Sequence, residues 1–149
     1  MVISINFRLQ DIRENMELSQ KEVADILKVS QPTYSRWEKE VEIIPLNKLI
    51  LLANYYGISL DYICNLSNIK KESKAYNYKV DKKISGNNIV TFRKEKNLTQ
   101  KELALFLNTT PSTVCAYEKG KTLILTSFAY QICKRYNVSM DYICGITKD

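Results

Sequence analysis

Apolar residues recur at helical spacing in two stretches that repeat one pattern 80 positions apart. Residues 19–39 read SQKEVADILKVSQPTYSRWEK, and residues 99–119 read TQKELALFLNTTPSTVCAYEK. In each stretch three apolar residues at i, i+3 and i+4 place one apolar stripe on a short helix. The stripes are Val23, Ile26 and Leu27 in the first copy and Leu103, Phe106 and Leu107 in the second. The pattern predicts a packed helix at the start of each stretch.

Capping signals mark where the predicted helices begin. A Ser or Thr followed three positions later by Glu forms a capping box, in which the hydroxyl and the carboxylate each accept from a backbone N–H group. The two boxes are Ser19 with Glu22 and Thr99 with Glu102. A second helix follows after a turn of about three residues, because Ser30 and Thr110 are good N-caps and each precedes a proline in the next turn. So short a turn predicts a steep crossing that presents the N-terminal end of the second helix.

These stretches resemble the Cro- and lambda-repressor-like helix-turn-helix proteins, also called the xenobiotic-response-element family, and so do SLDYIC and SMDYIC near the end of each copy. The resemblance covers nearly the whole chain, twice. It implies an all-α protein of two tandem five-helix lambda-repressor-like DNA-binding domains. The family often has Gly where Lys28 and Asn108 open the turn. Because Lys adopts a left-handed conformation less readily than Asn, the first turn is expected to be less tight than the family norm.

The remaining periodic stretches complete five helices in each copy. Residues 5–15, 46–56 and 59–66 supply the other helices of the first copy, and residues 88–96, 127–136 and 139–146 those of the second. Gly57 ends one of them as a C′ residue. Many identical residues pair at one offset, which indicates an internal duplication. The predicted domains are residues 1–68 and 86–149, joined by a basic linker over 69–85 that is partly helical.

The charge is unevenly divided between the copies. The chain has a net charge of +6. Residues 1–68 carry seven Lys or Arg against nine Asp or Glu, a net charge of −2, and residues 69–149 carry fifteen against seven, a net charge of +8. A basic half fits a polyanion as partner. The first residues mix charged with apolar positions, so we expect no signal peptide, no membrane span and a cytoplasmic protein.

Metal, cofactor and enzyme chemistry find little support. The four cysteines include no C-x-x-C pair, and the chain has no histidine, so no metal site is expected. Cys64 and Cys144 sit at matching apolar places and are expected to pack in the cores as thiols; a disulfide framework is the weaker interpretation. No glycine-rich phosphate loop, small-molecule site or nucleophile beside a base is evident. Asp61 and Asp141 are explained by favourable interaction with helix dipoles.

In the first copy, base-reading side chains lie on the outward side of the third helix, which is the second helix of the helix-turn-helix. Gln31 and Arg36 can form two hydrogen bonds with adenine and guanine edges respectively, and Thr33 lies beside them, although a solvated face would look similar. Gln20 resembles the family's phosphate-contacting glutamine; an exposed capping role is the alternative. The candidate residues of this copy are Gln20, Gln31, Pro32, Thr33, Arg36 and Lys39.

The second copy has poorer base readers at the matching positions. Ala116 replaces Arg36 and cannot hydrogen-bond to guanine, while lysines that flank Gly120 are plausible phosphate contacts. Its candidates are Gln100, Pro111, Ser112, Thr113, Ala116, Lys119 and Lys121. The inward aromatic residues are expected to be core anchors rather than stacking platforms: Tyr34, Trp37, Tyr62, Tyr117 and Tyr142.

The sequence therefore predicts a regulator that binds double-stranded DNA sequence-specifically through the third helix of each domain, and the resemblance alone favours repression. The alternative is a protein-interaction module of the antitoxin or anti-regulator type, in which the helix-turn-helix surface docks a protein partner. One chain could straddle two half-sites, or two chains could form a homodimer. The operator and the oligomeric state stay open at this point.

Overall fold

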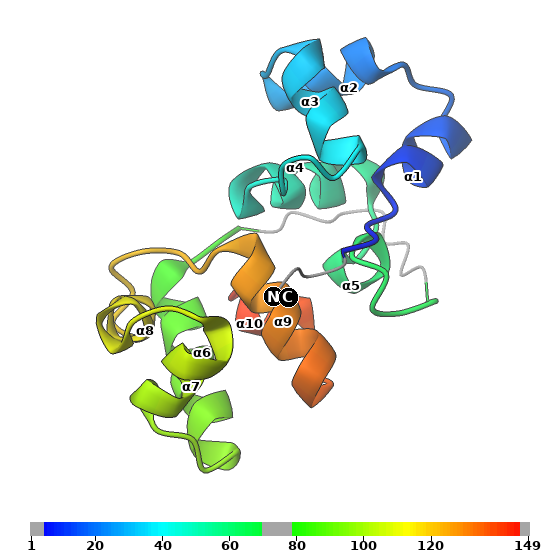
Figure 1. Cartoon of the computed structure of the whole chain (residues 1–149). Coiled ribbons are helices and arrows are strands. Elements are labelled where there is room, and N and C mark those ends of the chain that lie inside the picture. The colour runs from blue at the N-terminus through cyan, green and yellow to red at the C-terminus, as the bar shows by residue number, and fades with distance from the viewer. Residues whose placement is uncertain (1–4, 70–78, 147–149) are drawn as a thin grey trace. The chain divides into compact units, whose positions relative to one another are not determined.

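The computed structural model describes residues 5–69 and 79–146, which form two compact units, 1–77 and 78–149. Both units are helical, as Figure 1 shows. The described part has no strand; an isolated bridge pairs Val80 with Ile146 in the second unit. The all-α prediction of two tandem helix-turn-helix domains is thus confirmed.

The first unit contains five helices within its described residues. They are α1 (Leu9–Asn15), α2 (Gln20–Leu27), α3 (Gln31–Glu38), α4 (Leu46–Tyr56) and α5 (Leu60–Ile63). The first helix is shorter than the predicted 5–15, since Ile5 to Arg8 precede it outside the helix. Helix α3 packs against α1 and α2, and α4 packs against α2 and α5.

The second unit repeats this order over its described residues. It consists of α6 (Lys82–Glu95), α7 (Gln100–Leu107), α8 (Pro111–Glu118), α9 (Thr126–Tyr136) and α10 (Met140–Ile143). Helix α8 packs against α6 and α7, and α10 packs against α6 and α9. Each unit therefore surrounds its own core with the same sequence of helices.

The predicted capping signals form as expected. Both capping boxes are present, with Ser19 and Thr99 accepting from the backbone N–H groups of Glu22 and Glu102 at 3.0 Å each. Ser30 and Thr110 cap α3 and α8 in the same way. These local bonds satisfy N–H groups that a helix start leaves unpaired, so they set the same helix boundaries in both copies.

The turn between α2 and α3 is as tight as the turn between α7 and α8. Lys28 has φ 58° and ψ 43°, and Asn108 has φ 57° and ψ 47°. The expectation of a looser first turn is therefore wrong. Lys28 adopts the left-handed conformation at a cost in backbone energy, which the packing on either side of it offsets.

Residues predicted to be core anchors are mostly buried. Tyr34 is fully buried, and Trp37 and Tyr117 are each 6% exposed. Tyr142 is an exception at 40% exposed, so its assignment to the core was wrong. Its counterpart Tyr62 is half-buried and lies under the guanidinium of Arg8, with the carbon 4.1 Å from the ring centroid.

The second unit begins with a longer helix than the first. Asp81 caps α6, and the helix starts at Lys82, within the stretch predicted as linker and ahead of the expected start at residue 88. Gly86 allows this extension to approach α8, because a Cβ there would lie 2.5 Å from the carbonyl oxygen of Tyr117. The sequence signal was weak here, since Gly, Ser and Asn give little helix propensity.

The four cysteines are present as thiols, three of them buried and Cys115 half-buried. Cys64 and Cys144 pack in the two cores as predicted. Within residues 5–69 and 79–146, no cluster of His, Cys, Asp and Glu could hold a metal ion. No helix in the same ranges is both long and apolar enough to span a membrane.

Candidate nucleic-acid interface

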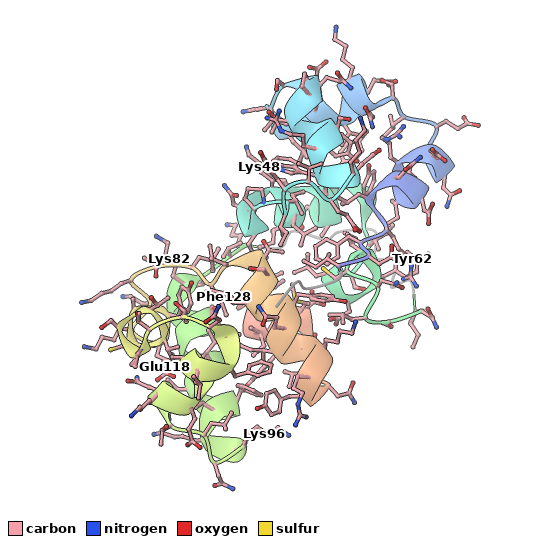
Figure 2. All side chains as sticks on the ribbon, in the orientation of Figure 1. Lys48, Tyr62, Lys82, Lys96, Glu118 and Phe128 are labelled. Carbon is pink, nitrogen blue, oxygen red and sulfur yellow. The ribbon has the colours of Figure 1, made fainter. Side chains whose placement is uncertain are left out.

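Helices α3 and α8 each bury one side and expose their N-terminal ends. In α3, Gln31 and Pro32 are exposed, Thr33 is half-buried and Arg36 is exposed on the side away from buried Tyr34 and Trp37. Figure 2 shows side chains extending outward around both helices. This exposed end is the part of a helix-turn-helix that fits a major groove.

A buried ion pair lies directly behind this surface in the first unit. Arg13 donates from Nε to Oε2 of Glu38 at 2.6 Å and from Nη2 to Oε1 at 3.1 Å. It also donates from Nη1 to the carbonyl oxygen of Leu18 at 2.9 Å. The side chain of Glu38 is only 2% exposed, and that of Arg13 is 12% exposed. The pair therefore connects α1, the start of α2 and the end of α3.

The surroundings of Glu38 keep its carboxylate ionised. Burial alone would raise the pKa of Glu38, but hydrogen bonds from Arg13 and Gln20, together with the positive charge of Arg13, outweigh burial and lower that pKa. Burial, together with the nearby Glu38 carboxylate, raises the pKa of Tyr34 well above its usual value. At neutral pH an ionised carboxylate, paired with Arg13, thus lies behind the first residue of α2.

Glu38 orients the glutamine that the sequence assigned to phosphate binding. Gln20 donates from Nε2 to Oε1 of Glu38 at 2.9 Å, and Gln31 donates from Nε2 to Oε1 of Gln20 at 2.7 Å. The structure therefore brings two predicted DNA-binding residues together. The bond holds the two glutamine side chains, one from α2 and one from α3, in a fixed relation at the surface.

The second unit repeats only the inner part of this network. Arg93 donates to both carboxylate oxygens of Glu118 at 2.6 and 3.1 Å, and Gln100 donates to Oε1 of Glu118 at 3.0 Å. Pro111 stands where the first unit has Gln31. A proline side chain has no amide group, so the outer hydrogen bond to the glutamine of α7 cannot form.

Two other predicted readers make contacts within the protein. The guanidinium Nε of Arg36 lies 3.3 Å from a carboxylate oxygen of Glu42, and both side chains are about half exposed. Thr33 shares a 2.8 Å hydrogen bond with the hydroxyl of Ser30, as Thr113 does with Thr110 at 3.0 Å. An exposed ion pair of this kind contributes little stability, so Arg36 can exchange Glu42 for another partner at small cost.

The other candidates lie separately along the same elements. In the second unit Pro111 and Ser112 are exposed, and Ala116 is half-buried. Lys39, Lys119 and Lys121 are exposed at or just after the ends of α3 and α8.

The ion pair itself was absent from the candidates. The sequence did carry a signal for it, because Arg13 and Glu38 recur as Arg93 and Glu118 at the offset of the duplication. A buried charge is tolerated when its partner is buried with it, and pattern analysis of one sequence does not show burial.

This geometry is that of a helix-turn-helix protein, and the chain belongs to the HTH_3 helix-turn-helix family. The family model matches residues 9–63 and again residues 89–143. The fold of this family of transcriptional regulators is a DNA-binding fold.

Two regulators from Bacillus subtilis (strain 168) are similar to part of the chain. The HTH-type transcriptional regulator YobD is 33% identical over 60 residues, 40% of this chain and 54% of its own length. The HTH-type transcriptional regulator ImmR is 26% identical over 72 residues, 48% of this chain and 57% of its own length. The chain thus spans about half the length of these curated relatives.

One solved structure is also similar in part. The clp gene regulator ClgR from Corynebacterium glutamicum has 20% sequence identity and a TM-score of 0.40, and the match covers 44% of this chain and 69% of that one.

Proposed function

We propose that this protein binds double-stranded DNA sequence-specifically as a transcriptional regulator, with α3 and α8 entering the major groove. The observation that carries the proposal is the Gln20–Gln31 pair at the exposed end of α3, fixed from behind by Glu38 and Arg13. Side chains held in one orientation lose little conformational entropy when they bind, which favours recognition of a fixed pattern of donors and acceptors.

The two units have different roles in this proposal. The first unit supplies Gln31 and Arg36 as base readers, whereas the second has Pro111 and Ala116 at the same places. The second half of the chain is the basic one, with the net charge of +8 over residues 69–149. It therefore supplies most of the attraction for phosphates, and the first unit supplies most of the sequence preference. Repression follows if the bound protein occludes a promoter.

Docking of a protein partner is the second candidate function, and one observation favours it. The first unit exposes Val41 (68%), Leu51 (46%) and Tyr55 (50%), where the second has Lys121, Gln131 and Arg135. Since the same fold forms with polar residues at these positions, the apolar ones are not required for folding. A protein partner could bind the first unit by covering these three apolar side chains, and this binding would not require DNA.

Fluorescence anisotropy with labelled duplexes tests the DNA-binding proposal. The full chain is titrated against random and genomic duplexes between roughly 50 and 200 mM salt, over which affinity should fall by orders of magnitude because bound cations are released from the phosphates. Binding that is undetectable at low salt, or that does not change with salt, contradicts the proposal and favours the protein-docking function.

A further inference from the structure

We propose that Lys82 and Lys83 join Lys119 and Lys121 in a single phosphate-binding site on the second unit, here called the four-lysine patch. Its ligand is the sugar-phosphate backbone of duplex DNA. This inference rests on the proposed function and adds to it a contact outside the helix-turn-helix itself, made by residues that the sequence placed in a linker.

The start of α6 lies directly against the loop that follows α8. A Cβ added to Gly120 would be 3.1 Å from both Cα and Cγ of Lys83 and 3.3 Å from the carbonyl oxygen of Lys82. Lys119 and Lys121 flank Gly120 in the chain. All four lysine side chains are exposed. The backbone therefore brings four exposed lysine residues from two distant segments to one region of the surface.

Gly120 is needed for this approach rather than for its backbone conformation. Its φ is +71°, but Glu40 occupies the matching place in the first unit with φ 60°. The fold thus accepts a side chain with this conformation. In the second unit a side chain would instead collide with Lys83, so glycine permits the close approach.

The two lysines of α6 do not help their own helix. Lys82 and Lys83 occupy its first two positions, and its first turn contains no acidic residue. Cations at a helix N-terminus oppose the helix dipole, so these two lysines are unfavourable for α6 itself. The nearby carboxylate of Asp81 accepts from the backbone N–H groups of Lys83 and Ile84 at 2.8 and 3.3 Å. Four neighbouring cations therefore retain a net positive charge, which a polyanion would neutralise.

The first unit lacks a comparable patch in its matching loop. Lys39 is followed there by Glu40, Val41 and Glu42, whereas Lys119 is followed by Gly120 and Lys121. The difference agrees with the proposed division of roles, in which the second unit holds the DNA. Because lysine acts as a point charge and phosphates are common to every sequence, this contact adds affinity without base preference.

Neutralising the two α6 lysines in the full chain tests the proposal. The double variant Lys82→Gln/Lys83→Gln is compared with Lys94→Gln/Lys96→Gln, which removes the same charge from exposed positions at and just after the other end of α6. Figure 2 labels Lys82 and Lys96 at opposite ends of the second unit. Affinity is measured by anisotropy as a function of salt, with one preferred and one random duplex, and stability is measured by circular dichroism.

The first double variant should lower the slope of log affinity against log salt by about 2, and affinity near 100 mM salt by about ten- to a hundredfold, on both duplexes. The control pair should retain the wild-type slope. Equal slopes for the two double variants overturn the patch, and a lower melting temperature with an unchanged slope shows that the lysines stabilise α8 instead. If the wild-type chain binds no duplex, the proposed function fails as well; if it binds and the slopes are equal, only the patch fails.

Discussion

Nε2 of Gln31 donates a 2.7 Å hydrogen bond to Oε1 of Gln20, so the first residue of α3 fixes the first residue of α2. Gln20 in turn donates to Glu38, whose charge strengthens that bond. Three side chains from two helices thus form one chain of hydrogen bonds that leads from a buried carboxylate to the surface. In such a network each member affects the position of the next.

The first prediction is that Gln20 and Gln31 act together in DNA binding. Gln31→Ala should cost about 1–3 kcal/mol on the preferred site through lost base contact. The double variant Gln20→Ala/Gln31→Ala should lose less binding free energy than the two single variants lose in sum, with a coupling free energy of about 0.5–3 kcal/mol. A double-mutant cycle measured by anisotropy checks this. Gln100→Ala with Pro111→Ala is the matched pair in the second unit and should be additive. Additivity in the first unit would contradict the coupling.

The second prediction separates base reading from phosphate binding on α3. Arg36→Ala should cost about 1–3 kcal/mol on the preferred site and weaken base preference, because a bidentate contact to guanine is lost. Lys39→Ala should weaken binding to all sequences alike, since a phosphate contact carries no base information. Selection from a random duplex pool with each variant measures both effects. If both variants retain the wild-type preference, α3 of the first unit is not the reader.

The third prediction concerns the stability of the first unit at low pH. The pKa of Glu38 is lowered in the folded state. Its contribution is therefore complete above the unfolded pKa, near 4.5, and is lost as pH falls through the lower folded pKa. Glu38→Gln should remove this dependence of stability on pH. It should also destabilise the first unit by roughly 3–5 kcal/mol, because it leaves Arg13 without its carboxylate. The lower end of that range is expected, since Arg13 retains some contact with solvent.

Trp37 makes this measurement specific to the first unit. It is the single tryptophan of the chain and is 6% exposed beside Glu38. Its fluorescence, followed during urea unfolding at several pH values, should report the loss in Glu38→Gln. Glu118→Gln removes the equivalent carboxylate from the second unit and should leave the Trp37 transition unchanged. A first unit whose stability does not change between pH 6 and roughly pH 3 would contradict the role of Glu38.

The helix boundaries could be predicted because they are fixed by local chemistry. Ser19 with Glu22, and Thr99 with Glu102, need only the next turn of chain to form their bonds. The outward position of Gln31 and Arg36 also followed from helical periodicity. The Gln20–Glu38 contact could not be predicted, because it joins residues 18 positions apart through tertiary packing. The same holds for Lys83 and Gly120, whose approach depends on the start of α6.

The first turn illustrates how packing overrides intrinsic preference. Lys28 was expected to loosen the turn, yet its φ of 58° is nearly that of Asn108. The packing of the helices on both sides determines the backbone there, and the lysine bears the cost. Intrinsic propensity therefore predicts that this position is strained, but it does not predict which conformation the position adopts.

That cost gives the fourth prediction. Lys28→Gly should stabilise the first unit by up to about 1 kcal/mol, since glycine relieves a left-handed strain of about 1–2 kcal/mol but gains entropy in the unfolded chain. Gly57→Ala, at φ 65°, should have the opposite sign. Urea unfolding followed by Trp37 fluorescence measures both variants. A less stable Lys28→Gly would mean that the lysine side chain contributes more than its conformation costs.

The last prediction concerns how the two units share one operator. If the first unit provides preference and the second provides attraction, the second unit mainly raises the effective concentration of the first near DNA. Residues 1–77 alone should then retain the sequence preference of the full chain and lose much of its affinity. Residues 78–149 alone should bind weakly, with little preference and with a steep dependence on salt. The cut between residues 77 and 78 follows the boundary of the two units and leaves Asp81 and the whole of α6 intact.

Circular dichroism first establishes that each fragment is helical, and anisotropy on the preferred and random duplexes then compares them with the full chain. A rival arrangement is a homodimer in which matching units of two chains pair across a two-fold axis. Sedimentation of the full chain on DNA separates the two, because the tether arrangement requires one chain per operator and the homodimer requires two. A second fragment with the sharper preference would reverse the roles of α3 and α8. In that case the Gln20–Gln31 hydrogen bond would stabilise the first unit without contributing to base recognition, and its absence at Pro111 would not affect the sequence preference of the second unit.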